Sequence, residues 1–400
     1  MDHPPPLMQR THGAQVPRDA TGSHSQPFAR MENVSRIAVL RPNAVGDFVF
    51  ALPALHALKH AYPDAELVYV GKEWHAQFLH GRPGPVDRVL VMPPLPGVGA
   101  PVAMGAGQEP EAGGEPAERF LARMRDERFD IALQMFGGGR FSNPFVAQFG
   151  ARLTVGARAA DAPPLERWTA YVEPGSRRLA LLEIAALAGA AVLPLQQELA
   201  VTDADRREAN AVLPASPAHG SKPRLAVLQP GASDARRRWS PGRFAAVGDA
   251  LAAHGVLVAI NGTEAEAELV EQVRAAMRHD AIGLAGKLSL GGLCGLLERA
   301  DVMVSNDTGP LHLALAIGTP CVGIFWHTNL ADGMPLRPSL LRAAVSARLH
   351  CPVCGIDKRT ARCAHAASFV DDVPVAEVVD MAFATLGLQR DSACEAPRRR

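Results

Sequence analysis

A polar, glycine-containing turn, Asn306-Asp307-Thr308-Gly309-Pro310, joins an apolar strand to a predicted helix. The first amides of a helix have no partner inside it, and we expect those of residues 309–312 to face the carboxyl edge of a sheet. Such a position binds anions such as phosphate, and Pro310 fits the first helical turn without the loss of a donor. The alternative is an ordinary capped turn, because Asp and Thr also favour helix caps.

A second turn of this kind follows the apolar strand predicted to begin at Leu225. Gly231 permits close approach of a ligand to the backbone, Ser233 can donate a hydroxyl, and residues 236–238 are three arginines. Guanidinium groups suit the oxygens of a diphosphate, so the segment predicts a second part of the phosphate site. The alternative is a solvated basic run on the surface.

A third candidate group is Asp47, which follows the predicted strand at 36–40 and a loop at 41–47. The residues from Phe48 to Ala61 are largely apolar and predict a helix. An aspartate at the start of a helix is favoured as an N-cap. Alternatively, Asp47 faces a cleft and acts as a general base, a role that requires reach to a substrate hydroxyl.

Taken in order, these segments resemble glycosyltransferase family 9, the group that contains the lipopolysaccharide core heptosyltransferases, over roughly residues 34–388. The matching segments are Val45-Gly46-Asp47, Gln229-Pro230-Gly231-Ala232 with the basic pair before Trp239, Leu284-Ala285-Gly286-Lys287 and Ser305-Asn306-Asp307-Thr308-Gly309-Pro310-Leu311-His312. The resemblance implies an α/β fold of the GT-B architecture, in which two Rossmann-like doubly wound domains face a central cleft. In such sheets ligands bind at the carboxyl ends of the strands, where the motifs fall.

The resemblance also implies roles for individual residues. Asp47 would deprotonate the acceptor hydroxyl, which attacks the anomeric carbon with inversion, and Arg237 would assist catalysis. Asn43, Gly46, Gly138 and Arg140 are expected to bind the acceptor, although the glycines at 137–139 also suit a flexible turn. The residues expected to bind the nucleotide sugar are Gly231, Ser233, Arg238, Glu266, Lys287, Asp307, Thr308, Gly309, Pro310 and His312.

Two departures from the family pattern concern the donor side. Arg237 stands where these heptosyltransferases usually carry Lys two residues before the Trp, which replaces a compact ammonium by a planar fork. Residues 325–329 read Phe-Trp-His-Thr-Asn, where the family tends to read Phe-Gly-Pro-Thr. Because this region lies beside the nucleotide in the family, the sequence does not determine the nucleotide base or the sugar of the donor.

The composition is that of an ordinary globular enzyme, with 400 residues of which 48% are hydrophobic. The 41 basic and 41 acidic side chains balance, which argues against a general nucleic-acid role. No apolar run reaches the roughly 18 residues that a membrane-spanning helix needs. By the resemblance, we expect a cytoplasmic protein that needs no cofactor and makes transient peripheral contact with the membrane. The expected donor is an ADP-linked nucleotide sugar, and the expected acceptor is a lipid-linked glycan.

Breaks in composition predict the organisation of the chain. We expect a disordered extension at 1–33, with Met31 as a second candidate start, an acceptor-side domain at 34–213 with a flexible insertion at 93–116, and a linker at 214–223. A nucleotide-sugar domain at 224–372 then precedes a helix within 373–390, which the resemblance packs back on the first domain, and a disordered tail at 391–400.

Three of the six cysteines cluster with a histidine as Cys351, Cys354, Cys363 and His365. Thiolates and an imidazole are ligands of structural zinc, although the spacing is looser than in a paired C-x2-C pattern. We interpret the cluster as a structural loop, reduced or redox-linked, with zinc as the alternative and no catalytic metal.

The family resemblance therefore predicts transfer of heptose from ADP-heptose, or of a related sugar, to a lipopolysaccharide-type acceptor. Two other functions are compatible with the same motifs. One is a GT-B nucleotide-binding scaffold without transfer activity, and the other is a sugar-nucleotide epimerase, which would need no acceptor.

Overall fold

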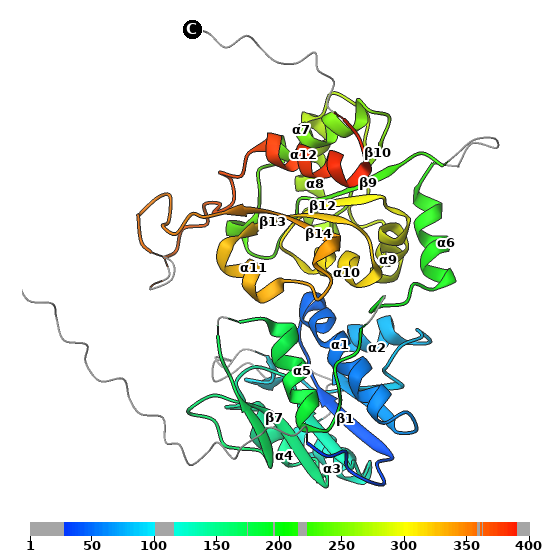
Figure 1. Ribbon diagram of the computed structural model, residues 1–400, viewed down its shortest axis with the longest axis vertical. Coiled ribbons are helices and arrows are strands. Elements are labelled where there is room, and N and C mark those ends of the chain that lie inside the picture. The colour runs from blue at the N-terminus through cyan, green and yellow to red at the C-terminus, as the bar shows by residue number, and fades with distance from the viewer. Residues whose placement is uncertain are drawn as a thin grey trace, which may run out of the picture.

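The computed structural model describes residues 28–100, 116–173, 175–194, 197–214, 222–357, 361 and 363–389. Most of the predicted N-terminal extension, most of the insertion at 93–116, residues 215–221 of the predicted linker and the tail lie outside these residues. Within them the chain forms two domains, each built on a six-stranded parallel sheet (Figure 1).

The first sheet has the strand order β3-β2-β1-β6-β7-β8. Its strands are β1 (Arg36–Leu40), β2 (Glu66–Gly71), β3 (Arg88–Val91), β6 (Ile131–Gln134), β7 (Leu153–Arg158) and β8 (Arg167–Ala170). The helices of this part are α1 (Val45–Ala61), α2 (Glu73–Leu79), α3 (Ala117–Asp126), α4 (Ser142–Ala147) and α5 (Arg177–Leu187), and a small ladder joins β4 (Leu95–Pro96) to β5 (Gly99–Ala100).

The second sheet repeats this order as β11-β10-β9-β12-β13-β14. Its strands are β9 (Leu225–Gln229), β10 (Leu257–Ile260), β11 (Ile282–Gly283), β12 (Val302–Asn306), β13 (Cys321–Trp326) and β14 (Leu341–Ser346). The remaining helices are α6 (Asp203–Val212), α7 (Pro241–Ala252), α8 (Ala267–Ala276), α9 (Leu290–Arg299), α10 (Gly309–Ile317), α11 (His327–Gly333) and α12 (Val375–Leu386), with short 3-10 turns η2 (Ala235–Arg237), η3 (Glu264–Glu266) and η4 (Pro338–Leu340).

The central strands consist of apolar runs because helices cover both faces of each sheet. Every residue of β9 and of β12 is buried. In both domains the strand order reverses beside the first strand, between β1 and β6 and between β9 and β12. This arrangement confirms the predicted doubly wound fold, and it puts the polar residues that follow β1, β9 and β12 at the reversal points, where ligands bind.

The two domains touch through α1 and α10, which lie at their junction in Figure 1. One apolar cluster runs continuously from the first domain into α9 and α10. Two buried polar contacts add to it: Arg178 of α5 donates to the Gly333 carbonyl oxygen at 2.8 Å, and Arg82 pairs with Asp205 of α6 at 2.6 Å. A charge buried in such a pair is costly to expose alone, so these contacts favour one arrangement of the domains.

Helix α6 packs against α9 and therefore joins the second domain before the predicted linker at 214–223. The approach is close because α9 presents glycines: a Cβ atom at Gly295 would lie 2.2 Å from the Asp205 carbonyl oxygen. The chain thus crosses between the domains ahead of Asp203, and the domain limits at 213 and 224 do not follow the packing.

The final helix, α12, also differs from its predicted position. It packs on α7 and on strands β12, β13 and β14 instead of on the first domain, and in Figure 1 it lies beside α7. Its buried face, which includes Val378, Ala382 and Phe383, belongs to the core of the second domain. The prediction that this helix returns to the first domain is wrong, because its apolar face completes the cover of the second sheet.

Candidate active site

Two cavities open at the carboxyl ends of the strands. The first-domain cavity, of about 250 Å³, is lined by Arg41, Asn43, Asp47, Met135, Phe136, Gly137, Ala157, Thr169, Ala170, Tyr171, Val172, Glu173, Gly175, Arg177, Ala180, Leu181, Ile184 and Asp332. The interdomain cavity, of about 310 Å³, is lined by Ala44, Gly46, Asp47, Phe50, Arg177, Ser233, Arg237, Asp307, Thr308, Gly309, His312, Asn329, Asp332 and Gly333. Asp47, Arg177 and Asp332 line both, so the two cavities meet at these side chains.

The interdomain cavity lies between two helix N-termini. Helix α1 begins at Val45 and α10 at Gly309, and each helix contributes its first-turn residues to the wall. The partial positive charges of both helix ends therefore act on the same space, which favours an anion.

Fewer backbone amides are free at the N-terminus of α10 than we predicted from the sequence. The amides of Leu311 and His312 donate to the Thr308 carbonyl oxygen at 3.1 and 3.4 Å, and Pro310 has no amide hydrogen. Thr308 occupies the N-cap position but makes no side-chain cap hydrogen bond. Its hydroxyl and the Gly309 amide are thus the groups of this turn that suit a bound phosphate.

Arg237 enters the cavity from the turn after β9 and is held by two partners. Its guanidinium donates to the Ser233 hydroxyl at 3.0 Å and lies 3.3 Å from an oxygen of the Asp307 carboxylate. The three arginines at 236–238 are half-buried, so they are not the solvated run of the alternative interpretation. Arg237 alone among them lines the cavity, which gives it a fixed position for neutralising a phosphate.

Asp307 is the centre of a buried network. Asn329 donates to Asp307 Oδ2 at 2.9 Å, and His312 Nε2 lies 3.2 Å from Oδ1. Burial acts to raise the pKa of Asp307, but the contacts with His312, Asn329 and Arg237 hold this pKa below its usual value. Burial also lowers the pKa of His312, against the effect of Asp307. The neutral imidazole then donates to a carboxylate that remains charged.

The two phosphate-site turns are tied together by Asn306. Its side-chain amide donates to the Pro230 carbonyl oxygen at 2.7 Å, and its oxygen accepts the Trp239 amide at 3.0 Å. Trp239 is fully buried and donates its ring N–H to the Val373 carbonyl oxygen at 3.1 Å. These bonds fix the segment that carries Arg237 against the end of β12.

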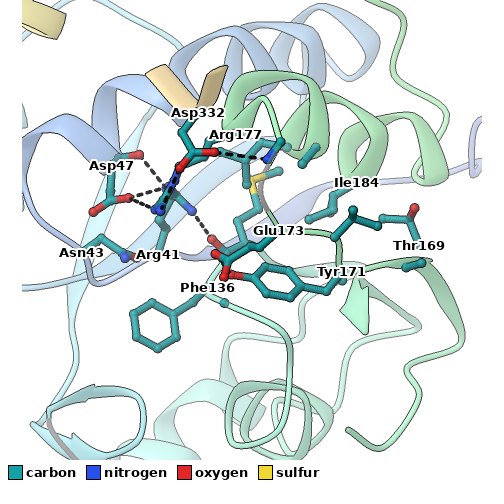
Figure 2. Close-up of a pocket in the computed structure, with 18 residues that line it drawn as sticks. Arg41, Asn43, Asp47, Phe136, Thr169, Tyr171, Glu173, Arg177, Ile184 and Asp332 are labelled. Carbon is teal, nitrogen blue, oxygen red and sulfur yellow. Dashed lines mark hydrogen bonds and ion pairs between the residues drawn. The ribbon is translucent and has the colours of Figure 1, made fainter. Parts of the chain in front are cut away.

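Asp47 lies in the first turn of α1, and its side chain is 23% exposed. Ala44 occupies the N-cap position without a side-chain hydrogen bond, so the N-cap interpretation of Asp47 is wrong. Arg177 approaches Asp47 Oδ1 at 3.3 Å and Arg41 approaches the same oxygen at 3.4 Å. Figure 2 shows these three side chains meeting at one end of the first-domain cavity. No contact to Oδ2 is found among the described residues, so this oxygen can accept a proton or a hydrogen bond.

Arg41 links the residue Asp47 to the end of β6. Burial lowers the pKa of its guanidinium, an effect that the charge of Asp47 opposes. Its Nε donates to the Asp47 carbonyl oxygen at 2.6 Å, and another nitrogen donates to the Met135 carbonyl oxygen at the end of β6. Arg41 therefore fixes the first turn of α1 to the sheet.

The first-domain cavity combines apolar and polar walls. Leu181 and Ile184 of α5 form an apolar side, and Tyr171 donates to the Glu173 carboxylate. Burial, followed by the contact with Glu173, raises the pKa of Tyr171 to about 12. The Asn43 side-chain oxygen is buried and has no hydrogen-bond partner among the described residues. A ligand rich in hydroxyl groups would satisfy these groups.

Several predicted site residues lie outside both cavities. Glu266 caps its own turn by accepting the Thr263 amide at 2.9 Å, and its carboxylate also packs on Gly231, where a Cβ atom would lie 2.0 Å from it. Arg238 donates to the Ala232 carbonyl oxygen at 2.8 Å, and Lys287 is exposed.

On the acceptor side, Gly138 packs against Tyr171, since a Cβ atom would lie 3.0 Å from the ring. Arg140 is exposed and pairs with Asp161 at 3.5 Å. Of the four residues expected to bind the acceptor, Asn43 lines the first-domain cavity and Gly46 lines the interdomain cavity.

The residues that sequence reasoning missed come mainly from α5, α11 and the loop after β8. Arg177, Asp332, Tyr171 and Glu173 reach the site from segments without a recognisable motif, whereas Asn329 belongs to the segment 325–329, which the resemblance places beside the nucleotide. A basic pair at 177–178 after Gly175 was the available signal for α5. Asp332 interacts with this segment, because its Oδ1 accepts the Gly175 amide at 3.1 Å.

The four candidate zinc ligands, Cys351, Cys354, Cys363 and His365, come together between β14 and α12. None of the four lines either cavity.

Comparison with known proteins identifies this arrangement. Residues 118–354 match glycosyltransferase family 9 (heptosyltransferase). The lipopolysaccharide core heptosyltransferase OpsX of Haemophilus influenzae is 23% identical over 309 residues, which cover 73% of this chain and 79% of that protein. The lipopolysaccharide heptosyltransferase 1 of Pseudomonas aeruginosa is also 23% identical, over 74% of this chain and 79% of that protein.

Solved structures show the same fold. The glycosyl transferase family 9 protein of Veillonella parvula superposes with a TM-score of 0.70 at 18% identity, covering 88% of this chain and 97% of that one. The ADP-heptose lps heptosyltransferase II of E. coli gives a TM-score of 0.64 at 18% identity, covering 88% and 98%. Both likenesses confirm the GT-B architecture. With the family match over more than half of its length, the chain belongs to glycosyltransferase family 9, the heptosyltransferase family.

Proposed function

We propose that the protein transfers heptose from ADP-heptose to a hydroxyl of a lipopolysaccharide-type acceptor with inversion, and that Asp47 is the general base. The observation that carries this proposal is the position of Asp47 where the two cavities meet. A base in this reaction must reach the acceptor hydroxyl while that hydroxyl faces the donor sugar. The place of Asp47 in the first turn of α1, on the walls of both cavities, supports this role.

The interdomain cavity is assigned to the donor diphosphate. Thr308, Gly309, Ser233 and Arg237 offer a hydroxyl, an amide, a second hydroxyl and a guanidinium. These groups, with the N-termini of α1 and α10, would stabilise the negative charge that develops on the leaving diphosphate. The choice of ADP rests on relatives whose names state ADP-heptose or heptosyltransferase. Glu266, Lys287 and Arg238 are proposed to contact the nucleoside beyond the cavity.

The first-domain cavity is assigned to the acceptor. Its apolar wall and its hydroxyl, carboxylate and amide groups suit the faces and hydroxyls of a sugar, and Arg41 and Arg177 suit an acidic one. In the reaction, Asp47 takes the proton of the acceptor hydroxyl as its oxygen bonds to the anomeric carbon. The bond from that carbon to the diphosphate oxygen breaks, and ADP leaves with the electron pair. Attack from the face opposite the leaving group inverts the anomeric configuration.

A lipid-linked acceptor requires contact with a membrane surface. None of the helices in the described part of the chain has the length and apolar character needed to cross a bilayer. We propose that the contact with the membrane is transient and peripheral and occurs at its cytoplasmic face. Flotation with vesicles that contain the acceptor lipid would detect this contact, and vesicles without it provide the control.

The function is tested by binding and then by turnover. ADP should raise the unfolding temperature of the protein more than UDP, GDP or CMP does, because a ligand of the native state stabilises it by mass action. With ADP-heptose and a heptose-deficient lipopolysaccharide acceptor, mass spectrometry should show the acceptor plus one heptose. Binding of ADP without transfer to any acceptor would instead support a scaffold, and a changed sugar nucleotide without acceptor would support an epimerase.

A further inference from the structure

The loop between β14 and α12 brings three thiols and one imidazole together. The ligand atoms of Cys351, Cys354, Cys363 and His365 all lie within 4.8 Å of one another, and Cys351 Sγ is 3.7 Å from His365 Nδ1. In a tetrahedral zinc site with bonds of about 2.3 Å to sulfur, the sulfur atoms are about 3.8 Å apart. The observed cluster therefore needs only a small contraction to bind a zinc ion.

The backbone around the first two cysteines is folded as a tight turn. The Gly355 amide donates to the Cys351 carbonyl oxygen at 2.9 Å, and the Cys351 amide donates to the Ile356 carbonyl oxygen at 2.9 Å. Gly355 has a φ of +72°, a conformation that favours glycine. The amides of Val353 and Cys354 also donate hydrogen bonds to the Cys351 sulfur. Such amides stabilise a thiolate and orient it as a metal ligand.

We propose that Cys351, Cys354, Cys363 and His365 bind one structural zinc ion. Three sulfur ligands and one nitrogen ligand complete a tetrahedral set without an open position, which is typical of structural rather than catalytic zinc. The described residues of the loop between β14 and α12 have no regular secondary structure apart from a single bridge between His350 and Asp357. A metal ion would provide the cross-links that a loop without a core of its own lacks.

The zinc site also has a structural connection to the donor cavity. Directly after His365, the Ser368 hydroxyl donates to the Arg238 carbonyl oxygen at 2.6 Å, and the Phe369 amide donates to the Arg236 carbonyl oxygen at 2.8 Å. These bonds hold the backbone on either side of Arg237. The proposed zinc ion would therefore hold in place the loop that fixes Arg237, the arginine proposed to bind the donor phosphate. Loss of the zinc should weaken donor binding although the metal does not contact the donor.

The first test is the metal content of the full chain, purified without a histidine tag and without chelators. We expect about one zinc per chain by inductively coupled plasma mass spectrometry, as for a closed site of four protein ligands. Iron in place of zinc would overturn the zinc assignment. A chain with no bound metal, or an intact mass showing a disulfide among the three cysteines, would overturn the site itself.

Variants then locate the metal. Cys354→Ser and Cys363→Ser should each lose most of the zinc, whereas Cys294→Ala, which changes a buried cysteine of α9, should retain it. Cobalt(II) added to the chelator-treated wild-type chain should give the visible bands of tetrahedral thiolate coordination, a readout that needs no folded variant. Full zinc in both serine variants, or no cobalt bands, would contradict the proposal.

A separate measurement of ADP binding tests the connection between the zinc site and Arg237. The unfolding temperature of the zinc-depleted wild-type chain should rise less with ADP than that of the zinc-loaded chain, and added zinc should restore the difference. Equal stabilisation by ADP in both forms would show that the metal does not support the donor cavity, while the metal content would still test the site.

Discussion

Gly46 and Gly309 meet at the junction of the domains: a Cβ atom at Gly309 would lie 3.3 Å from the Gly46 amide nitrogen. These glycines stand in the first turns of α1 and α10, so their contact sets how closely the two helix N-termini approach the same cavity. The absence of side chains here keeps Asp47 and Thr308 on opposite walls of one small space.

The Gly309→Ala substitution should therefore weaken ADP binding. The added methyl group must push α1 away by a few tenths of an ångström, and crowding of this kind costs about 1 kcal/mol or more, which is about fivefold in affinity. Isothermal titration with ADP measures the change. Gly242→Ala in the first turn of α7 is the control, because its Cβ atom would meet nothing within 4 Å. An unchanged affinity in Gly309→Ala would mean that the helix contact does not shape the donor site.

Asp47→Asn should remove transfer and leave donor binding in place. The loss of a general base lowers turnover by about 100-fold to 10,000-fold, whereas the contacts to the diphosphate come from other residues. Turnover and ADP stabilisation of the same sample give both readouts. Normal turnover of this variant would exclude Asp47 as the base.

Asp332→Asn is the matched control, since Asp332 lines the same two cavities. One of its oxygens accepts the Gly175 amide, a bond that an asparagine oxygen can also make. This variant should keep turnover within about tenfold of the wild type, because the base itself remains. If Asp332→Asn loses turnover and Asp47→Asn does not, the roles of the two carboxylates are reversed.

Arg237→Met should weaken ADP binding by at least about tenfold, the effect of losing a charged hydrogen bond to a phosphate. Arg238→Met should have a smaller effect, because Arg238 lies outside the cavity and bonds to the Ala232 carbonyl oxygen. Arg237→Lys, which restores the residue usual in the family, should retain part of the affinity through its charge. A titration series over the three variants would contradict this order if Arg238→Met were the weakest binder.

Stability should fall as the pH drops below about 6.5, partly because of His75. Burial lowers the pKa of this imidazole from 6.5 to about 3 in the folded protein. Between these values the unfolded chain binds one more proton than the folded chain, so the stability present above pH 6.5 is lost toward pH 3. The contribution is about 1.4 kcal/mol for each pH unit in that window.

Urea unfolding of His75→Phe tests this assignment. The variant should lose free energy of unfolding less steeply than the wild type between pH 6.5 and pH 4.5, a range above the titration of most carboxylates. Thr202→Ala, which removes the N-cap of α6, should lower stability with an unchanged slope. Parallel pH profiles for His75→Phe and the wild type would show that His75 does not cause the loss of stability at low pH.

The positions of Asp47, Arg237, Thr308 and Gly309 could be predicted because a parallel sheet has one ligand-binding edge. Once a strand and the polar turn after it are recognised, topology places the turn at that edge. Arg177 and Asp332 could not be placed in this way. Arg177 meets Asp47 because α5 packs on α1 within the first domain, and Asp332 reaches Arg177 from α11 of the second domain.

The two helices that were misplaced illustrate the same limit. The helix within 373–390 was predicted, but its buried face alone does not determine which sheet it covers. The position of α6 depends on α9, because the glycines of α9 permit the close approach of α6. Two helices pack together when their surfaces are complementary. A single sequence does not show which surfaces from distant parts of the chain are complementary.

The division of the site between two domains affects the fate of the activated sugar. Thr308 and Arg237 belong to one domain and Asp47 to the other, and they share a cavity only while α1 touches α10. A nucleotide sugar held by the second domain alone has no carboxylate of α1 beside it to activate a water molecule. A change that separates Gly46 from Gly309 should therefore take the proposed base away from a donor held by the second domain, so that neither the acceptor nor a water molecule is activated beside it.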